Sequence, residues 1–171
     1  DPQMQLYAAS FRLHDLQPSE LKNVQFNLDK KAVQSTVKAP LVNIVPDIQS
    51  WMNGKILLDE LILHSPDISL HTQINKGTTS TTGQMPETAI QHIRLDDPQI
   101  DFSKQTDSGL VKLSWKRVAG GDNTLDASGL HISPSAYALG SIQFNLAHFT
   151  FTNEQGKTFS TGNGHIRASL K

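Results

Sequence analysis

Cysteine is absent from this sequence of 171 residues. Its absence excludes disulfide frameworks, thiol catalysis and cysteine-based zinc sites. It leaves the compartment open, because a chain without thiols is compatible with both the cytosol and an oxidising periplasm. No apolar run approaches the length that a membrane-spanning helix needs, so the sequence predicts no transmembrane helix.

Charged and aromatic residues are also scarce. Charged residues make up 18% of the chain and aromatic residues 6%, and 15 basic against 16 acidic residues leave a net charge of −1. This balance gives no broad electrostatic footprint for nucleic acid or for an anionic membrane, and we expect no nucleic-acid partner. Polarity rests instead on Ser, Thr, Asn and Gln, which suits strand surfaces and turns.

Apolar and polar residues alternate with a period of two along most of the chain, which is the pattern of half-buried β-strands. The alternation is clearest at 24–28, 68–72, 111–115, 142–146 and 166–170. Such signals recur about every 10 residues, a spacing typical of antiparallel β architecture. At Phe149 and Phe151 the apolar positions change parity, which predicts a bulge or bend after residue 146.

One short helix near residues 46–53 is predicted to interrupt the strands. Pro46 suits the first turn of a helix, and Ile48, Trp51 and Met52 have helical spacing. A helix of two turns needs a surface to pack on, so we interpret it as a cap over one end of a sheet.

An internal repeat is the most informative feature of the sequence. Residues 61–73 match residues 93–105 at a single offset, with Pro66 aligned to Pro98. Each copy reads as two short strands joined at a proline, which lacks a backbone donor and belongs at a bend or an edge. Repetition of such a unit predicts a laterally extended sheet. Residues 76–87, between the two copies, are predicted to form a flexible loop.

These patterns together predict a single, mainly β domain over residues 1–171. We expect an extended, twisted antiparallel sheet with the one short helix near residues 46–53. Two arrangements remain open, because the sheet can form an open groove or fold on itself as a two-layer sandwich.

Catalytic motifs are not found, and we predict a protein that is not an enzyme, with no catalytic residue, no cofactor and no metal site. The seven histidines form no HExxH or His-x-His pattern, and no nucleophile elbow, P-loop or dinucleotide-binding glycine motif is present. The densest carboxylate group, Asp96, Asp97 and Asp101, lacks an EF-hand pattern and is interpreted as a solvated turn.

The run from residue 11 to residue 70 resembles the strand–strand–short-helix–strand–Pro–strand unit of the AsmA-like superfamily. Alternating strands lead into the helical turn at 48–52, and Lys55 and the phrase ILLDELILHSPDISL follow. A second phrase at 93–102 fits the same register, and the match covers about half the chain. Members of that superfamily resemble bridge-like lipid carriers, with a membrane anchor followed by a long curved sheet whose concave face is apolar.

The resemblance implies a location in the bacterial cell envelope, on the periplasmic side. It implies a role in holding or guiding lipid, or in scaffolding envelope assembly. The family's membrane anchor is missing from this chain and the chain is short, so we expect it to be a fragment of a longer envelope protein. Exposed strand edges are then expected to pair with neighbouring domains or with other copies.

The physical logic of that function can be stated separately for an open sheet. A curled sheet that does not close leaves an apolar face without a partner, and acyl chains can cover it, with about 0.8 kcal/mol gained per buried CH₂. The candidate groove residues are Val24, Phe26, Leu28, Ile68, Leu70, Ile100, Phe102, Phe144 and Leu146. The alternative is a β-sandwich binding or adhesion module for carbohydrate or protein, acting through exposed residues such as Trp115 or Tyr137.

Overall fold

The computed structural model describes residues 3–7, 10–12, 19–30, 33–47, 50, 56–73, 88–117, 123–132, 137–161 and 165–170. These residues form strands that all belong to one hydrogen-bonded sheet, which confirms the mainly β prediction. In chain order the strands are β1 (Gln3–Tyr7), β2 (Ser10–Arg12), β3 (Ser19–Lys30), β4 (Val33–Pro46), β5 (Ile56–His64), β6 (Asp67–Gln73), β7 (Thr88–Asp96), β8 (Gln99–Gln105), β9 (Leu110–Trp115), β10 (Thr124–Ile132), β11 (Tyr137–Ala138), β12 (Ser141–Ala147), β13 (Phe149–Thr152), β14 (Thr158–Ser160) and β15 (His165–Leu170).

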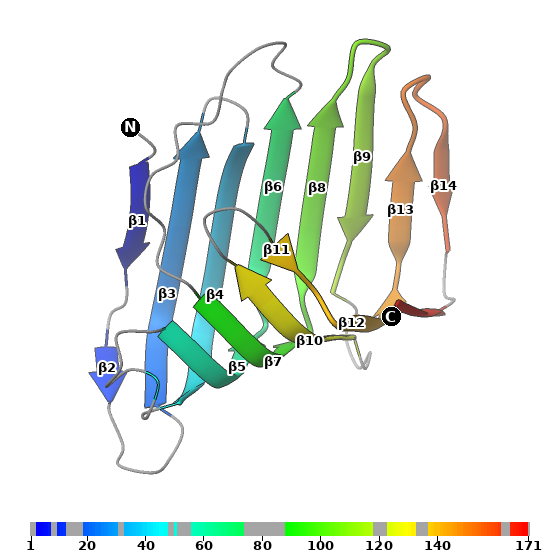
Figure 1. The fold of residues 1–171 in the computed structure, drawn as a ribbon. Helices are drawn as coiled ribbons and strands as arrows, with labels where there is room; N and C mark the ends of the chain where they lie inside the picture. Colours follow the sequence, from blue (N-terminus) through cyan, green and yellow to red (C-terminus); the bar gives the residue numbers. More distant parts are fainter. Residues whose placement is uncertain are drawn as a thin grey trace.

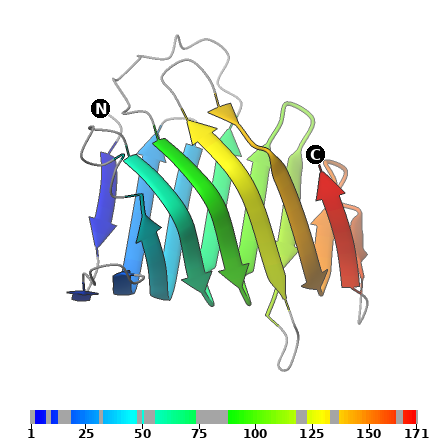
Figure 2. The ribbon, with the colours of Figure 1, turned by 60° about the horizontal axis from the view of Figure 1, so that its bottom comes forward.

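The sheet is bent into two arms that share β3 and β4 (Figure 1). The upper arm also contains β1, β6, β8, β9, β13 and β14. The lower arm also contains β2, β5, β7, β10, β12 and β15, whose long strands lie side by side in Figure 2. The strand order ends at β14 in one arm and at β15 in the other, so the sheet is open and no two-layer sandwich forms from the described strands.

The sequence repeat forms neighbouring strands in both arms. β5 pairs with β7, and β6 pairs with β8, at the offset of the repeat, so that Leu61 lies beside Ile93 and Gln73 beside Gln105. Both pairs are parallel, because each copy of the repeat runs from the lower arm into the upper arm. The sheet is therefore mixed, which the alternation pattern alone does not distinguish from a purely antiparallel sheet.

A line of left-handed residues marks the bend between the arms. Asn23, Ser65, Asp97 and His148 are the described residues other than glycine with a positive φ, at 52°, 46°, 48° and 53°. Asn23 lies within β3, and the others separate β5 from β6, β7 from β8 and β12 from β13. One residue of this kind bends a strand and changes the parity of its side chains. The predicted change of parity after residue 146 is confirmed at His148.

Prolines and one arginine hold this bend in place. Pro66 and Pro98 follow Ser65 and Asp97 directly, and both side chains are fully buried. The guanidinium of Arg117 donates hydrogen bonds to the carbonyl oxygens of Ser65 and Asp97, the latter with an N···O distance of 2.9 Å. It also lies 2.9 Å from Oδ1 of Asp67. Arg117 follows the end of β9 and thus connects that strand to both copies of the repeat at the bend.

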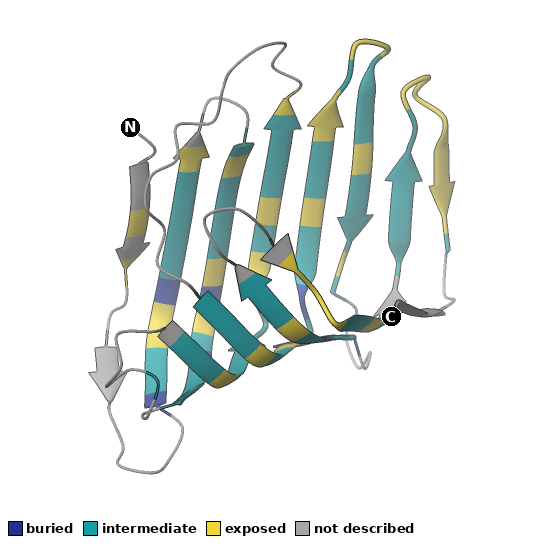
Figure 3. Ribbon diagram, in the orientation of Figure 1, coloured by how far each residue is buried: buried dark blue, intermediate teal, exposed yellow. Residues whose placement is uncertain are grey.

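The fully buried core is small and follows the bend. The buried apolar residues among those described are Val24, Ala39, Val42, Leu95 and Ala127. The chain exposes 11374 Å², whereas a compact protein of its 18.8 kDa exposes about 8,300 Å². Figure 3 shows that most of both arms is at intermediate burial. Few apolar side chains of the described sheet are therefore fully buried.

The predicted helix and loop fall largely where the structure is not described. Of residues 46–53, Pro46 ends β4, and only Asp47 and Ser50 are described beyond it; Ser50 Oγ donates to Asp47 Oδ2 at 2.6 Å. The loop at 76–87 lies outside the described residues.

Gly109 and Gly156 give a matched test of how the hairpin tips of the upper arm pack. Both have a positive φ, but a Cβ on Gly109 would collide with the backbone carbonyl of Glu154, whereas one on Gly156 would meet open space. Gly109→Ala is expected to lower the free energy of unfolding by about 2–4 kcal/mol, and Gly156→Ala by about 1 kcal/mol. Urea unfolding of both variants tests this, and equal losses would contradict it.

Candidate functional site: the inner face of the bent sheet

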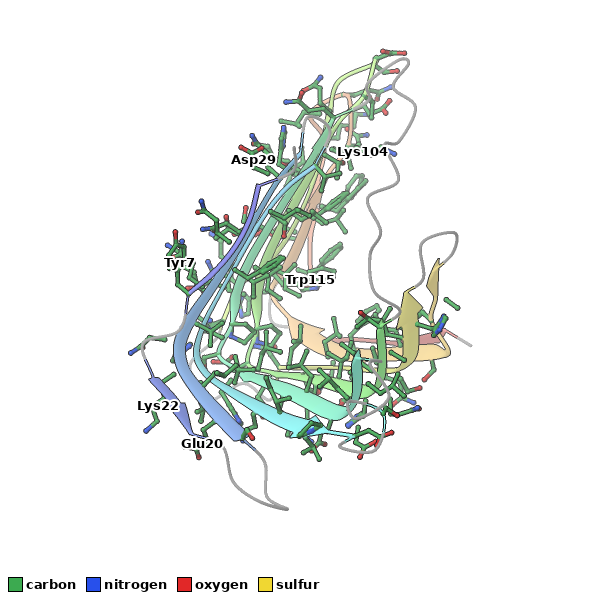
Figure 4. The ribbon with its side chains drawn as sticks, turned by 60° about the vertical axis from the view of Figure 1, so that its left-hand side comes forward. Tyr7, Glu20, Lys22, Asp29, Lys104 and Trp115 are labelled. Carbon is green, nitrogen blue, oxygen red and sulfur yellow. The ribbon has the colours of Figure 1, made fainter. Side chains whose placement is uncertain are left out.

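The concave side of the bend, here called the inner face, is the candidate site. Figure 4 shows the Trp115 side chain on this side, whereas Tyr7, Asp29, Glu20 and Lys22 point away on the outer face. Residues paired across neighbouring strands project to the same face, and every second residue along a strand does so. The strand register therefore assigns the other side chains to a face.

In the upper arm, two apolar rows cross the sheet on the inner face, at right angles to the strands. The row nearest the bend is Phe26, Val37, Ile68, Ile100, Trp115 and Phe149. The next row is Leu28, Ser35, Leu70, Phe102, Leu113, Phe151 and Phe159. A third row, still farther from the bend, is more polar and places Thr72 beside Lys104. The upper arm thus has an apolar inner surface with a polar rim.

The lower arm continues the same surface beyond the bend. Its first row is Leu21, Val42, Leu63, Leu95, Leu125 and Phe144. Its second row is Ser19, Ile44, Leu61, Ile93, Ala127 and Ile142. Leu21, Ile44, Leu61 and Leu63 pack on the buried cluster around Val42, which confirms that these side chains share one face.

Aromatic contacts join the two arms near the β13 end of the inner face. The Trp115 ring of the upper arm meets the Phe144 ring of the lower arm edge-on, with centroids 6.2 Å apart. Trp115 also packs against Phe149 at 5.1 Å, and Phe151 stacks on Phe159 at 6.4 Å. Phe159 lies at the edge of the sheet and is 60% exposed. The apolar surface therefore runs out to the edge of the described sheet.

The outer face of the upper arm is polar, and its side chains form hydrogen bonds with one another. His71 Nδ1 lies 2.7 Å from Ser103 Oγ, and Ser114 Oγ donates to Asp101 Oδ1 at 2.6 Å. The contrast between the faces matters, because a sheet that is polar on one side and apolar on the other needs cover only on the apolar side.

The lower arm carries a charged cluster on its outer face. His92 lies between Glu60, at 3.2 Å, and Asp126, at 3.5 Å. Arg94 Nε lies 2.6 Å from Asp96 Oδ1, and the hydrogen bond and charge of Asp96 raise the pKa of Arg94. Within the described part of the chain, no three His, Asp or Glu side chains are arranged to hold a metal ion. The His92 contacts join β7 to its two neighbouring strands, and the Arg94–Asp96 ion pair lies within β7 at the surface.

The structure brings together most of the candidate groove residues. Seven of them lie on the inner face as half-buried side chains, and all but Phe144 are in the upper arm: Phe26, Leu28, Ile68, Leu70, Ile100, Phe102 and Phe144. Val24 is 8% exposed and belongs to the packed core at the bend. Leu146 lies on β12, and its side chain is outside what the structure describes.

Several inner-face residues are absent from the candidate set. They include Val37, Leu113, Trp115, Phe149 and Phe151 in the upper arm, and the first row of the lower arm other than Phe144. The period-two pattern contains Leu113 and Trp115, which share a parity on β9. The pattern does not tell which face of the sheet this set of side chains occupies. The pairing of β9 with Ile100 and Phe102 of β8 places it on the inner face.

The chain was compared with protein-family models, curated proteins and solved structures, and none of them matches it. Among the described residues, no helix is long and apolar enough to cross a membrane. The geometry of the inner face is therefore the basis for a functional assignment.

Proposed function

We propose that this chain is a non-enzymatic lipid-holding or lipid-guiding segment of AsmA-like type in the bacterial cell envelope. The observation that carries the proposal is the inner face itself. Its apolar rows cross the described strands of both arms, their side chains are mostly half-buried, and no second layer of described residues covers them.

Acyl chains are the ligand that fits this surface best. The rows present no charged residue until Lys104 near the upper rim, so an acyl chain can lie on the inner face with its headgroup towards that polar rim. Burying about ten methylene groups there contributes roughly 8 kcal/mol before the costs of ordering the chain. No directional polar contact is needed for such a ligand.

The location rests on the resemblance at residues 11–70 and 93–102. We place the chain on the periplasmic side of the envelope for that reason. A purely scaffolding role in the same place would leave the inner face without lipid, and the two roles can be distinguished by what the protein carries.

Mass spectrometry of a solvent extract from gently purified protein tests the proposal. We expect phospholipid or another acyl lipid at a defined ratio to protein, and none in extracts of a denatured sample or of a closed β-sandwich of similar size. A clean extract combined with no uptake of added lipid would overturn lipid holding and favour the scaffold.

Fluorescence of Trp115 provides a second test that needs no bound lipid at purification. In a Trp51→Phe background, a brominated fatty acid is expected to quench most of the Trp115 emission, because bromine quenches only on contact and Trp115 lies on the inner face. The matched control also carries Trp115→Phe and Lys112→Trp, which moves the indole to an exposed outer-face position on the same strand. Equal quenching of both proteins would show non-specific binding.

A further inference from the structure

Among the described strands the sheet has two unpaired edges, and the two edges are arranged alike. At one edge β1 and β2 pair only with β3, and at the other β14 pairs only with β13 and β15 only with β12. Each edge therefore consists of one segment in the upper arm and one in the lower arm, separated at the bend.

The two edges also run in the same direction. β1 passes from Gln3, opposite Asp29 near the upper rim, towards the bend, and β2 continues into the lower arm. β14 passes from Thr158, opposite Thr152, towards the bend, and β15 continues into the lower arm. If one edge met the other, the strands would pair in parallel, as the repeat strands β5–β7 and β6–β8 already do.

The two edges have the same backbone register relative to the rows of the inner face. At the level of the second upper row, Leu28 pairs with Met4 at one edge, and Phe151 pairs with Phe159 at the other. At the level of the first lower row, Leu21 pairs with Phe11, and Phe144 pairs with Ala168. Joining the edges would therefore place strand segments of the same level side by side in both arms.

Two features that protect exposed edges are missing from the upper-arm edges, although β14, with 3 residues, is short. These two features are charged residues and proline. Neither β1 nor β14 contains either, and each carries an exposed aromatic residue, Tyr7 at 57% and Phe159 at 60%. A straight strand could cover only one arm of such an edge, whereas a second copy of this chain has the same bend in the same place.

We propose that copies of this chain associate head to tail, with the β14–β15 edge of one copy pairing with the β1–β2 edge of the next. The contact is heterologous and leaves a free edge at each end, so it continues into longer assemblies. The inner faces of successive copies then form one surface. This association does not depend on lipid binding and can fail or hold independently of it.

Sedimentation velocity over a range of protein concentrations tests the association. The paired segments would be short, because β2 and β14 have 3 residues each, and this predicts a weak interaction, so the range extends from about 10 µM to about 1 mM. We expect the mean sedimentation coefficient to rise beyond that of a dimer. Phe159→Lys should abolish growth, whereas Gln155→Lys, which adds the same charge in the adjacent turn, should not. A monomer throughout this range would overturn the proposal.

Mixing two blocked variants tests the head-to-tail geometry. Phe159→Lys blocks the β14 edge and Tyr7→Lys blocks the β1 edge, and circular dichroism shows whether each variant keeps its sheet. Each alone should be a monomer, and an equimolar mixture should form a dimer that grows no further, because only one unblocked pair of edges remains. Dimers of either variant alone would show that like edges pair and would overturn the head-to-tail arrangement.

Discussion

Replacing Phe102 with aspartate is expected to remove bound lipid while leaving the sheet folded. Phe102 lies in the middle of the second upper row, between Leu70 and Leu113, and its side chain is half-buried. In the empty protein the new carboxylate can reach water. An acyl chain lying on the row would remove that water, and the cost of about 2 kcal/mol or more lowers lipid binding by at least roughly tenfold.

The measurement is the lipid-to-protein ratio in the extract, together with the urea midpoint of the variant. Thr36→Asp is the matched control, because it places the same charge on the outer face of the same arm, between Asn27 and Ser69. Phe144→Asp is expected to lose stability as well as lipid, since Phe144 packs on Trp115 where the arms meet. Unfolding of Phe102→Asp, or full lipid retention in it, would contradict an open lipid-holding face.

Replacing Arg117 with alanine is expected to cause a much larger loss of stability than replacing Arg94, a surface arginine of β7. The guanidinium of Arg117 donates hydrogen bonds to two backbone carbonyls and forms an ion pair with the carboxylate of Asp67, and its side chain is 30% exposed. Charge-assisted hydrogen bonds of this kind are strong, and their removal leaves the carbonyls of Ser65 and Asp97 without that donor. We expect the free energy of unfolding to fall by about 2–3 kcal/mol.

Urea denaturation of Arg117→Ala and Arg94→Ala makes the comparison. Arg94 pairs with Asp96 on the exposed outer face, so its loss should cost about 0.5 kcal/mol or less. Arg117→Lys should recover only part of the loss, because an ammonium cannot present the forked donors of a guanidinium. Equal effects of the two alanine variants would show that the bend does not depend on Arg117.

Much of the sheet could be predicted from the sequence, because its strands are amphipathic and its repeat is explicit. The alternation located strands such as β6 and β9, and the aligned prolines located the break between paired segments. The bend was signalled only locally, by the change of parity after residue 146 and by the two aligned prolines, and not as one feature that crosses the whole sheet. Asn, Asp and His adopt the left-handed backbone more often than other residues that carry a Cβ, which suits Asn23, Asp97 and His148, whereas Ser65 is a residue type that rarely adopts it.

The inner face could be predicted in part for the same reason. Parity shows which residues of one strand share a face, and this grouped Phe102 with Ile100 and Phe26 with Leu28. It does not show that Trp115 lies beside Phe149 and across the bend from Phe144, since those contacts join strands distant in the chain. Long-range register therefore determines the site.

The small core determines the order in which the strands unfold and allows strands to be added at the edges of the sheet. With little buried volume at the centre, each strand is held chiefly by the two strands beside it, so stability adds up along the sheet as it does in repeat proteins. Opening should then begin at the outermost strands and proceed inward, and amide exchange should slow step by step from β14 towards β6. A further bent strand pair could be added at either edge without repacking any existing one.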